Sequence, residues 1–322
     1  MMWGCGASEA ERLQNLVAQS GNVPRVVGLV MPMKILRLFS LHLLSVSITG
    51  LCCAAEAVKI AELADKQVNE SSGLALSARD PQVFWTVNDS GGEACVFAFD
   101  QSGKARGKVA VKDAFNFDWE DLGSGPGSDG APALYVADIG DNLLKRPVVQ
   151  IYEIPEPEFE AKESAPAKVW AGIYPDGSHN AECLLVDPVS GALTILTKSE
   201  DGGSFLYAFP EKWQEVPMVL KRVGEVQFPA FGRPGKRPID DCMATGSCIS
   251  ADRKRVVVST YCHLLEWEIR YGEPLSEAMA REAARILPPL TPQMEAICYD
   301  SDHATLWFTS ERLPTPLYRL RR

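Results

Sequence analysis

Three glutamates occupy the same place in a repeated pattern, at the start of a short apolar segment. They are Glu120, Glu182 and Glu295, and Ser72 and Thr245 stand at the equivalent place in two further repeats. If these positions meet around one axis, the carboxylates raise one another's pKa unless a cation or a proton compensates their charge. The pattern therefore predicts an ion site. The alternative is that these carboxyls accept hydrogen bonds from turns and backbone amides.

Each of the five residues begins a segment with one layout. A short apolar strand is followed by a turn rich in Asp, Pro, Ser or Gly, then by a second β-branched or aromatic strand and a polar loop. The second strands cover residues 84–89, 134–138, 193–198, 256–261 and 306–311. The repeat spacings are 48, 62, 63 and 50 residues, which are blade lengths of a β-propeller. We therefore predict an all-β, five-bladed β-propeller, with a sixth blade between Lys212 and Asp241 as the alternative.

The ends of the repeat array predict how the ring closes. Only 27 residues follow Glu295, enough for three strands, whereas residues 58–63 form a strand without a blade of its own. We expect this strand to be the outer strand of the last blade, where it removes an open sheet edge. The pattern from Pro274 to Arg285 predicts a short helical insertion in the fourth blade. Residues 58–322 are thus expected to be a single β-propeller domain.

The N-terminal residues 1–57 predict a secretory signal peptide with an extension before it. Lys34 and Arg37 precede an apolar run over 38–51, and Ala55-Glu56-Ala57 fits a small-x-small cleavage site. Met33, directly before the basic residues, is the expected translation start. A retained membrane anchor is the alternative, although the run is shorter and more polar than a spanning helix. We expect an exported protein, periplasmic or extracellular.

Export places six cysteines of the mature chain in an oxidising compartment. A tight turn over 251–254 would bring Cys242 beside Cys262, so this pair is the expected disulfide. The alternative is that most of the six are buried free thiols.

Charge and composition exclude several classes of protein. The 322 residues carry a net charge of −10, opposite in sign to a nucleic-acid-binding surface. Hydrophobic residues make up 46% of the chain, and only one segment resembles a membrane span, which excludes a polytopic membrane protein. We expect a monomer without a membrane span after signal cleavage. Its expected partner is a cell-envelope ligand, a protein, or a small phosphorylated substrate.

The polar loops of a propeller gather at one end of its axis, because the loop entering each inner strand lies beside the loop leaving the second strand. The expected metal ligands are Glu120, Asp121, Glu182, Glu295, Asp138 and Asp141. The expected ligand-binding residues are Asn88, Asp89, Asn142, Asn180, Lys198, Tyr261, Glu311 and Arg312. Oxygen ligands favour Ca²⁺, with Mg²⁺ as the alternative. The four histidines are scattered and form no zinc set, and no catalytic residue is identified.

Four stretches resemble a family of largely uncharacterised, exported bacterial β-propeller proteins. They are residues 85–91 (WTVNDSG), 118–121 (DWED), 138–142 (DIGDN) and 180–182 (NAE), and the resemblance covers about residues 70–260. The layout is more distantly similar to the calcium-dependent apyrases, five-bladed propellers with an axial Ca²⁺, and to the phytase-like propellers, six-bladed calcium enzymes that hydrolyse phosphoesters. The resemblance implies an axial ring made by Ser72, Glu120, Glu182, Thr245 and Glu295.

Two functions remain open. The first is a non-enzymatic module that binds a ligand or a protein, with the cation holding its loops. The second is a calcium-dependent phosphoester or phosphoanhydride hydrolase, in which Lys198 and Arg312 would neutralise charge on the substrate. Basic residues near the acidic end, Lys198, Arg146 and Arg312, are few for a polyphosphate. The sequence therefore favours the binding module.

Overall fold

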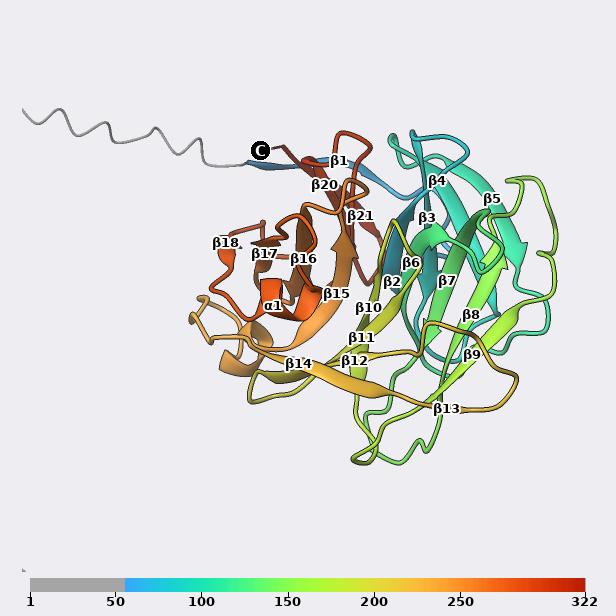
Figure 1. The fold of residues 1–322 in the computed structure, drawn as a ribbon. Helices are drawn as coiled ribbons and strands as arrows, with labels where there is room; N and C mark the ends of the chain where they lie inside the picture. Colours follow the sequence, from blue (N-terminus) through green and yellow to red (C-terminus); the bar gives the residue numbers. More distant parts are fainter. Residues whose placement is uncertain (1–55, 322) are drawn as a thin grey trace, which may run out of the picture. The chain divides into compact units, whose positions relative to one another are not determined.

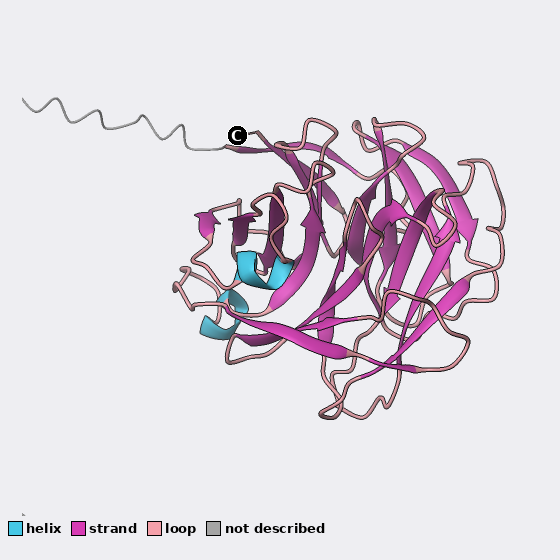
Figure 2. Cartoon of the chain, viewed as in Figure 1, coloured by secondary structure: helices cyan, strands magenta, loops and turns pink. Residues whose placement is uncertain are grey.

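Five β-sheets contain the strands of residues 56–321, the part of the chain described by the computed structural model (Figure 1). Strands and loops make up nearly all of this part (Figure 2). The predicted signal peptide, its extension and the start at Met33 lie outside the described residues, apart from Glu56 and Ala57. No helix among residues 56–321 is long and apolar enough to span a membrane.

The five sheets follow one another along the chain as blades 1 to 5. Blade 1 consists of β2 (Ser71–Leu76), β3 (Val83–Asn88), β4 (Cys95–Asp100) and β5 (Ala105–Ala110). Blade 2 consists of β6 (Trp119–Pro126), β7 (Pro132–Asp138), β8 (Val149–Pro155), β9 (Lys168–Ile173) and β13 (Met218–Val219). Blade 3 consists of β10 (Ala181–Val186), β11 (Leu193–Thr197), β12 (Gly203–Ala208) and β14 (Lys221–Gln227).

Blades 4 and 5 complete the array. Blade 4 consists of β15 (Ala244–Ile249), β16 (Arg255–Thr260), β17 (Leu264–Glu268) and β18 (Ala284–Ile286). Blade 5 consists of β19 (Met294–Tyr299), β20 (Leu306–Ser310), β21 (Pro316–Leu320) and β1 (Ala57–Glu62). The first strand of each blade contacts the first strand of the next, and β19 contacts β2. The inner strands β2, β6, β10, β15 and β19 therefore form a closed ring, which confirms the predicted five-bladed β-propeller.

The strand predicted to close the ring does so. β1 pairs antiparallel with β21, from Ala57 opposite Leu320 to Glu62 opposite Pro316. The first strand thus completes the sheet begun by the last three strands, as expected for a fold that leaves few open edges.

An apolar core fills each of the five spaces between neighbouring blades. Successive side chains of a strand point to opposite faces, so a strand in the middle of a blade serves two cores. In β7, Ala133, Tyr135 and Ala137 pack toward blade 3, whereas Leu134 and Val136 pack toward blade 1. The continuous apolar runs of the middle strands follow from burial on both faces.

The structure excludes the alternative of a sixth blade and differs from the sequence-based expectations in the extent of the helix and in the state of the cysteines. No sixth blade forms within residues 212–241, because β13 and β14 complete blades 2 and 3. The helix expected over 274–285 is confined to α1 (Leu275–Met279), which lies between β17 and β18 in the chain. It ends early because residues 284–286 pair with β17, while the carbonyl of Arg281 accepts a hydrogen bond from the Trp267 indole at 2.9 Å.

The expected disulfide between Cys242 and Cys262 is wrong, since all six cysteines in the described part are free thiols. A short 3₁₀ helix, η2 (Pro238–Asp241), precedes Cys242 and replaces the regular strand that the pairing required. Cys242 packs in the core between blades 3 and 4.

Close packing of the inner strands makes a glycine in β15 critical for stability. A Cβ atom on Gly246 would lie 1.8 Å from the carbonyl oxygen of Glu295 in the neighbouring inner strand. We expect Gly246→Ala to lower the free energy of unfolding by about 3 kcal/mol or more, because a backbone must move. The matched control is Gly92→Ala, where the nearest heavy atom is 3.9 Å away. Urea denaturation should place the control within about 1 kcal/mol of the parent protein; similar losses in both variants would contradict the prediction.

Candidate metal centre

A β-bulge recurs near the start of each inner strand and redirects one side chain. In β6, Trp119 pairs with Asp138 and Asp121 pairs with Ala137, so Glu120 has no partner in β7. The same irregularity falls at Ser72, Glu182 and Thr245, and across Glu295 and Ala296 in blade 5. Bulges of this kind re-aim side chains. The five positions that the sequence aligns are therefore structurally equivalent, and we call them the ring residues and their end of the axis the acidic mouth.

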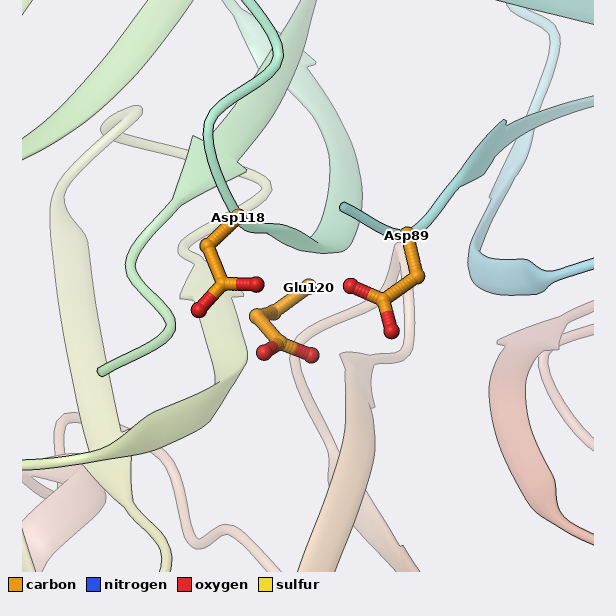
Figure 3. A group of neighbouring side chains, drawn as sticks. All are labelled: Asp89, Asp118 and Glu120. Carbon is orange, nitrogen blue, oxygen red and sulfur yellow. The ribbon is translucent and has the colours of Figure 1, made fainter. Parts of the chain in front are cut away.

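Three carboxylates from blades 1 and 2 converge at the acidic mouth. Asp89 follows β3, Asp118 precedes β6, and Glu120 is the ring residue of blade 2. Each contributes one oxygen to a group in which all three oxygens lie within 4.8 Å of one another. Figure 3 shows the three side chains turned toward one another. We call this set the carboxylate trio. It is the one group of three such ligands among residues 56–321.

Backbone contacts fix the loops that carry the trio. The buried Asn116 side chain donates to the carbonyl oxygen of Asp89 at 2.8 Å and accepts from the Trp119 amide at 3.3 Å. The Gly140 amide donates to the Asp118 carbonyl at 3.2 Å. One side chain thus ties the loop after β3 to the start of β6.

Gly140 leaves room for two of these carboxylates. A Cβ atom there would lie 2.3 Å from Glu120 Oε1 and 2.4 Å from Asp118 Oδ2. Only a residue without a side chain allows the backbone to approach this closely.

Burial and neighbouring carboxylates raise the pKa values of all three trio residues. Burial raises the pKa of Asp89 to about 7, against the hydrogen bond from the Ser90 amide, and nearby Glu311 and Asp118 add to the rise. The pKa of Glu120 is raised well above its ordinary range, first by burial and then by Glu182. Burial also raises the pKa of Asp118, while Arg146 opposes the rise. The protein must therefore hold protons or a cation here near neutral pH.

The ring residue of blade 3, Glu182, is paired with a lysine. Lys198 forms an ion pair with Glu182 Oε1 and donates to the Tyr261 hydroxyl at 2.8 Å. Burial alone would lower the pKa of Lys198, but Glu182 and the other ring glutamates raise it above its ordinary value. Glu182 Oε2 is buried and has no hydrogen-bond partner among the described residues. Half of this carboxylate is therefore free to bind something else.

The ring residue of blade 5 shares its environment with a second carboxyl group. Burial, followed by a hydrogen bond with Glu311, raises the pKa of Glu295 well above its ordinary value. Gln293 also lies 3.4 Å from Glu295 Oε1. Two carboxyl groups can share a hydrogen bond only if one of them carries a proton.

The remaining predicted metal ligands have other partners. Asp121 accepts hydrogen bonds from the amides of Leu122 and Leu184 at 2.8 and 2.7 Å. Asp138 forms an ion pair with Arg146 at 2.7 Å, and Asp141 accepts from the Arg146 amide at 2.6 Å. Of the six predicted metal ligands, the trio contains only Glu120. Asp89 was expected to bind ligand rather than metal, and Asp118 belonged to neither predicted set.

Most of the predicted ligand-binding residues surround one cavity at the acidic mouth. The cavity has a volume of about 700 Å³. Five of the eight predicted residues line it: Asn142, Asn180, Lys198, Tyr261 and Arg312. Asn88 instead holds the chain before β2, through hydrogen bonds to the Glu70 amide and the Gln67 carbonyl.

Two basic residues line this cavity that the sequence did not place in the predicted site. Lys236 and Arg237 both line it, on the segment that leads into η2. Arg237 pairs with Asp240 at 2.7 Å, while Lys236 donates to the carbonyls of Thr291 and Pro292 at 2.9 and 3.0 Å. Their stretch carries no propeller repeat, so only its glycines and basic residues could have drawn attention to it.

The raised pKa values predict how stability depends on pH. With its pKa raised to about 7, Asp89 keeps a proton in the folded protein up to that pH, whereas the unfolded chain has already released it. The raised pKa of Glu120 acts in the same direction. The stability that these groups contribute is present at low pH and is lost as pH rises. Without divalent cations, we expect the free energy of unfolding to fall between pH 5 and 7 by about 1.4 kcal/mol per pH unit for each such proton. Urea denaturation at several pH values in the presence of chelator measures this pH dependence of the free energy of unfolding. Asp89→Asn should flatten the profile, and a parent profile that is flat or rising would contradict the prediction.

Comparison with known proteins gives the chain no family. No protein-family profile matches it, and a search of curated proteins finds no relative. Since a fold by itself does not specify function, the function has to be argued from the acidic mouth.

Proposed function

We propose that this protein is a binding module whose ligand docks at the acidic mouth beside a divalent cation held by Asp89, Asp118 and Glu120. The observation that carries the proposal is the convergence of three carboxylate oxygens within 4.8 Å of one another. Two oxygens bound to one Ca²⁺ at about 2.3–2.6 Å lie no more than about 5 Å apart. The spacing of the trio is therefore compatible with one shared ion.

Two further features support a cation rather than three turn carboxylates. Within residues 56–321, no hydrogen-bond donor is found for the Glu120 carboxylate, although this side chain is only 3% exposed. Glu182 Oε2, also buried, has no hydrogen-bond partner there either, and the charge of Glu182 acts on both Asp89 and Glu120. Buried carboxylates without donors are costly unless a cation compensates them.

The donor set favours a hard ion. All the candidate ligand atoms are carboxylate oxygens, which suit Ca²⁺ or Mg²⁺ and not a soft metal. The trio comes from the loop after β3 and from the start of β6, and it has no sixfold arrangement of its own, so the more tolerant Ca²⁺ is our preferred ion. Water or a docked ligand would complete its coordination.

The cavity beside the ring supplies the surface for that ligand. Lys198 and Tyr261 both line the cavity and contact each other, and Lys198 also contacts Glu182. Asparagine and glutamine side chains, Asn142, Asn180 and Gln293, add hydrogen-bonding groups of either kind. A volume of about 700 Å³ lies within the range of small-molecule sites. A polar ligand or a polar protein segment fits this chemistry.

Calcium should raise the melting temperature of the purified protein. An ion that binds only the folded state stabilises it by about 2.7 kcal/mol at one hundred times its dissociation constant. We expect a concentration-dependent rise at pH 8 that Glu120→Gln removes. The same variant should melt at a higher temperature than the parent in chelator, because it eliminates a buried carboxylate without a donor. Differential scanning calorimetry in chelator and across a calcium titration measures both effects.

Two further variants separate ion binding from general damage. Gly140→Ala should weaken the calcium response at least tenfold in concentration, because its Cβ would displace both Asp118 and Glu120. Glu215→Gln, at an exposed position outside the mouth, should respond like the parent. The proposal fails if the parent shows no calcium-dependent shift, or if the shift persists in Glu120→Gln.

A calcium-dependent phosphoester or phosphoanhydride hydrolase is the second candidate. Four basic residues line the cavity, Lys198, Lys236, Arg237 and Arg312, and they would offset the charge of a phosphorylated substrate. A bound Ca²⁺ would supply Lewis-acid polarisation of a phosphoryl oxygen.

The hydrolase predicts turnover that depends on both calcium and Lys198. ATP, phytate and p-nitrophenyl phosphate, each with calcium or with chelator, are suitable substrates. Lys198→Met should lower any calcium-dependent rate at least tenfold, whereas the exposed Lys221→Met should leave it unchanged. Absence of turnover on all three substrates, in protein that binds calcium, would exclude the hydrolase and leave the binding module.

A further inference from the structure

The end of the axis opposite the acidic mouth contains a second cavity with different chemistry. It has a volume of about 380 Å³ and is lined by the later residues of all five inner strands. One apolar side chain from each blade illustrates the lining: Leu74, Leu122, Leu184, Ile249 and Cys298. These strands all begin at the acidic mouth, and each residue advances a strand by about 3.3 Å. The second cavity therefore lies beyond the ring residues, at the far end of the strands.

A buried carboxylate separates this cavity from the ring. Asp121 follows the ring residue of blade 2 and reaches two other blades, through the Leu184 amide at 2.7 Å and the Ser247 hydroxyl at 3.3 Å. It is fully buried. Asp121 is thus engaged by neighbouring blades and does not line the second cavity.

Charge is nearly absent from the lining. Among the described residues that line the cavity, the one charged side chain is Asp300. Its carboxylate already accepts hydrogen bonds from the Trp307 indole at 2.8 Å and from the Ser301 amide at 2.6 Å. Ser247 is engaged by Asp121, and Ser77 by Glu156 at 2.5 Å. The lining contributed by residues 56–321 includes no lysine or arginine to hold an anion.

The volume bounds the size of an occupant. A cavity of about 150 Å³ lined by apolar side chains holds a benzene molecule, so 380 Å³ accommodates a molecule of two or three rings. Pockets of about 300 Å³ and more with mostly apolar walls are the usual sites of small-molecule binding.

We propose that the far end of the axis is a binding site for an uncharged, largely apolar small molecule of two to three rings. The assignment rests on the volume of the cavity, its apolar walls from five blades, and its lack of a free charge. It does not depend on the cation at the acidic mouth.

Two probes with one carbon skeleton test the proposal on the full chain. N-phenyl-1-naphthylamine is uncharged and fluoresces in apolar surroundings, whereas 8-anilino-1-naphthalenesulfonate adds a sulfonate to the same skeleton. We expect one saturable site per chain for the uncharged probe, and at least tenfold weaker binding of the sulfonate, because no cation lines the cavity. Equal or tighter binding of the sulfonate would overturn the assignment.

Substitutions that fill the cavity locate the site. Cys248→Phe and Ser124→Phe add volume from blades 4 and 2. Each should weaken the uncharged probe at least tenfold, while Val216→Phe, at a position that is 60% exposed and outside the cavity, should not change it. The half-buried Ser124 keeps the test valid if Cys248→Phe fails to fold. If either variant folds and still binds the uncharged probe as tightly as the parent protein does, the proposal is wrong.

Cys248 provides an independent reporter of occupancy. It lines the cavity, and it is the one residue among the six described cysteines that is not fully buried. Methylmercury labelling of Cys248, located by peptide mass mapping, should slow at least tenfold in the presence of saturating N-phenyl-1-naphthylamine. An unchanged labelling rate would overturn the proposal. So would displacement of the probe by an acetylated trileucine amide at lower concentrations than naphthalene, because the occupant would then be a peptide.

Discussion

The acidic mouth depends on one constraint, the extra residue that each inner strand carries near its start. In a regular strand, successive side chains point to opposite faces, and every side chain of an inner strand would pack toward a neighbouring blade. The bulge releases Glu120, Glu182 and the region of Glu295 from this alternation. Closing the ring then brings the released carboxylates together. Both the bulge in each inner strand and the closure of the five blades into a ring are required to form the acidic mouth.

Once carboxylates are gathered in this way, their charge must be compensated, and the protein does so differently in each blade. Glu182 is paired with Lys198. Glu295 is hydrogen-bonded to Glu311, which requires a proton. Glu120 has neither a lysine nor a hydrogen-bond donor of its own among the described residues, and it is the ring glutamate that Asp89 and Asp118 approach. The uneven compensation explains why a cation site would lie toward blades 1 and 2 and not on the centre of the axis.

The repeats and the closing strand could be predicted from the sequence because both follow from spacing. Each inner strand and its bulge recur with a recognisable residue, and a strand left without a blade must close the ring. The ligand set could not be predicted in the same way. Asp121 was expected beside Glu120, but the bulge ends between the two, so Asp121 points to backbone amides of its own and the next blade. Lys236 and Arg237 reach the cavity from outside the repeats, where no periodicity indicates their position.

The direction of the inner strands also explains why the two ends of the axis differ. All five strands begin at the acidic mouth with a polar or acidic ring residue and continue into apolar residues such as Leu122 and Leu184. Because the five inner strands run in the same direction, their polar first residues gather at one end of the axis and their apolar later residues gather at the other. Asp121 lies where one chemistry changes to the other, and its buried hydrogen bonds to β10 and β15 hold the blades together there. A change of the apolar end can thus alter its cavity while the ring residues keep their positions, since the two regions share only this carboxylate and the strands themselves.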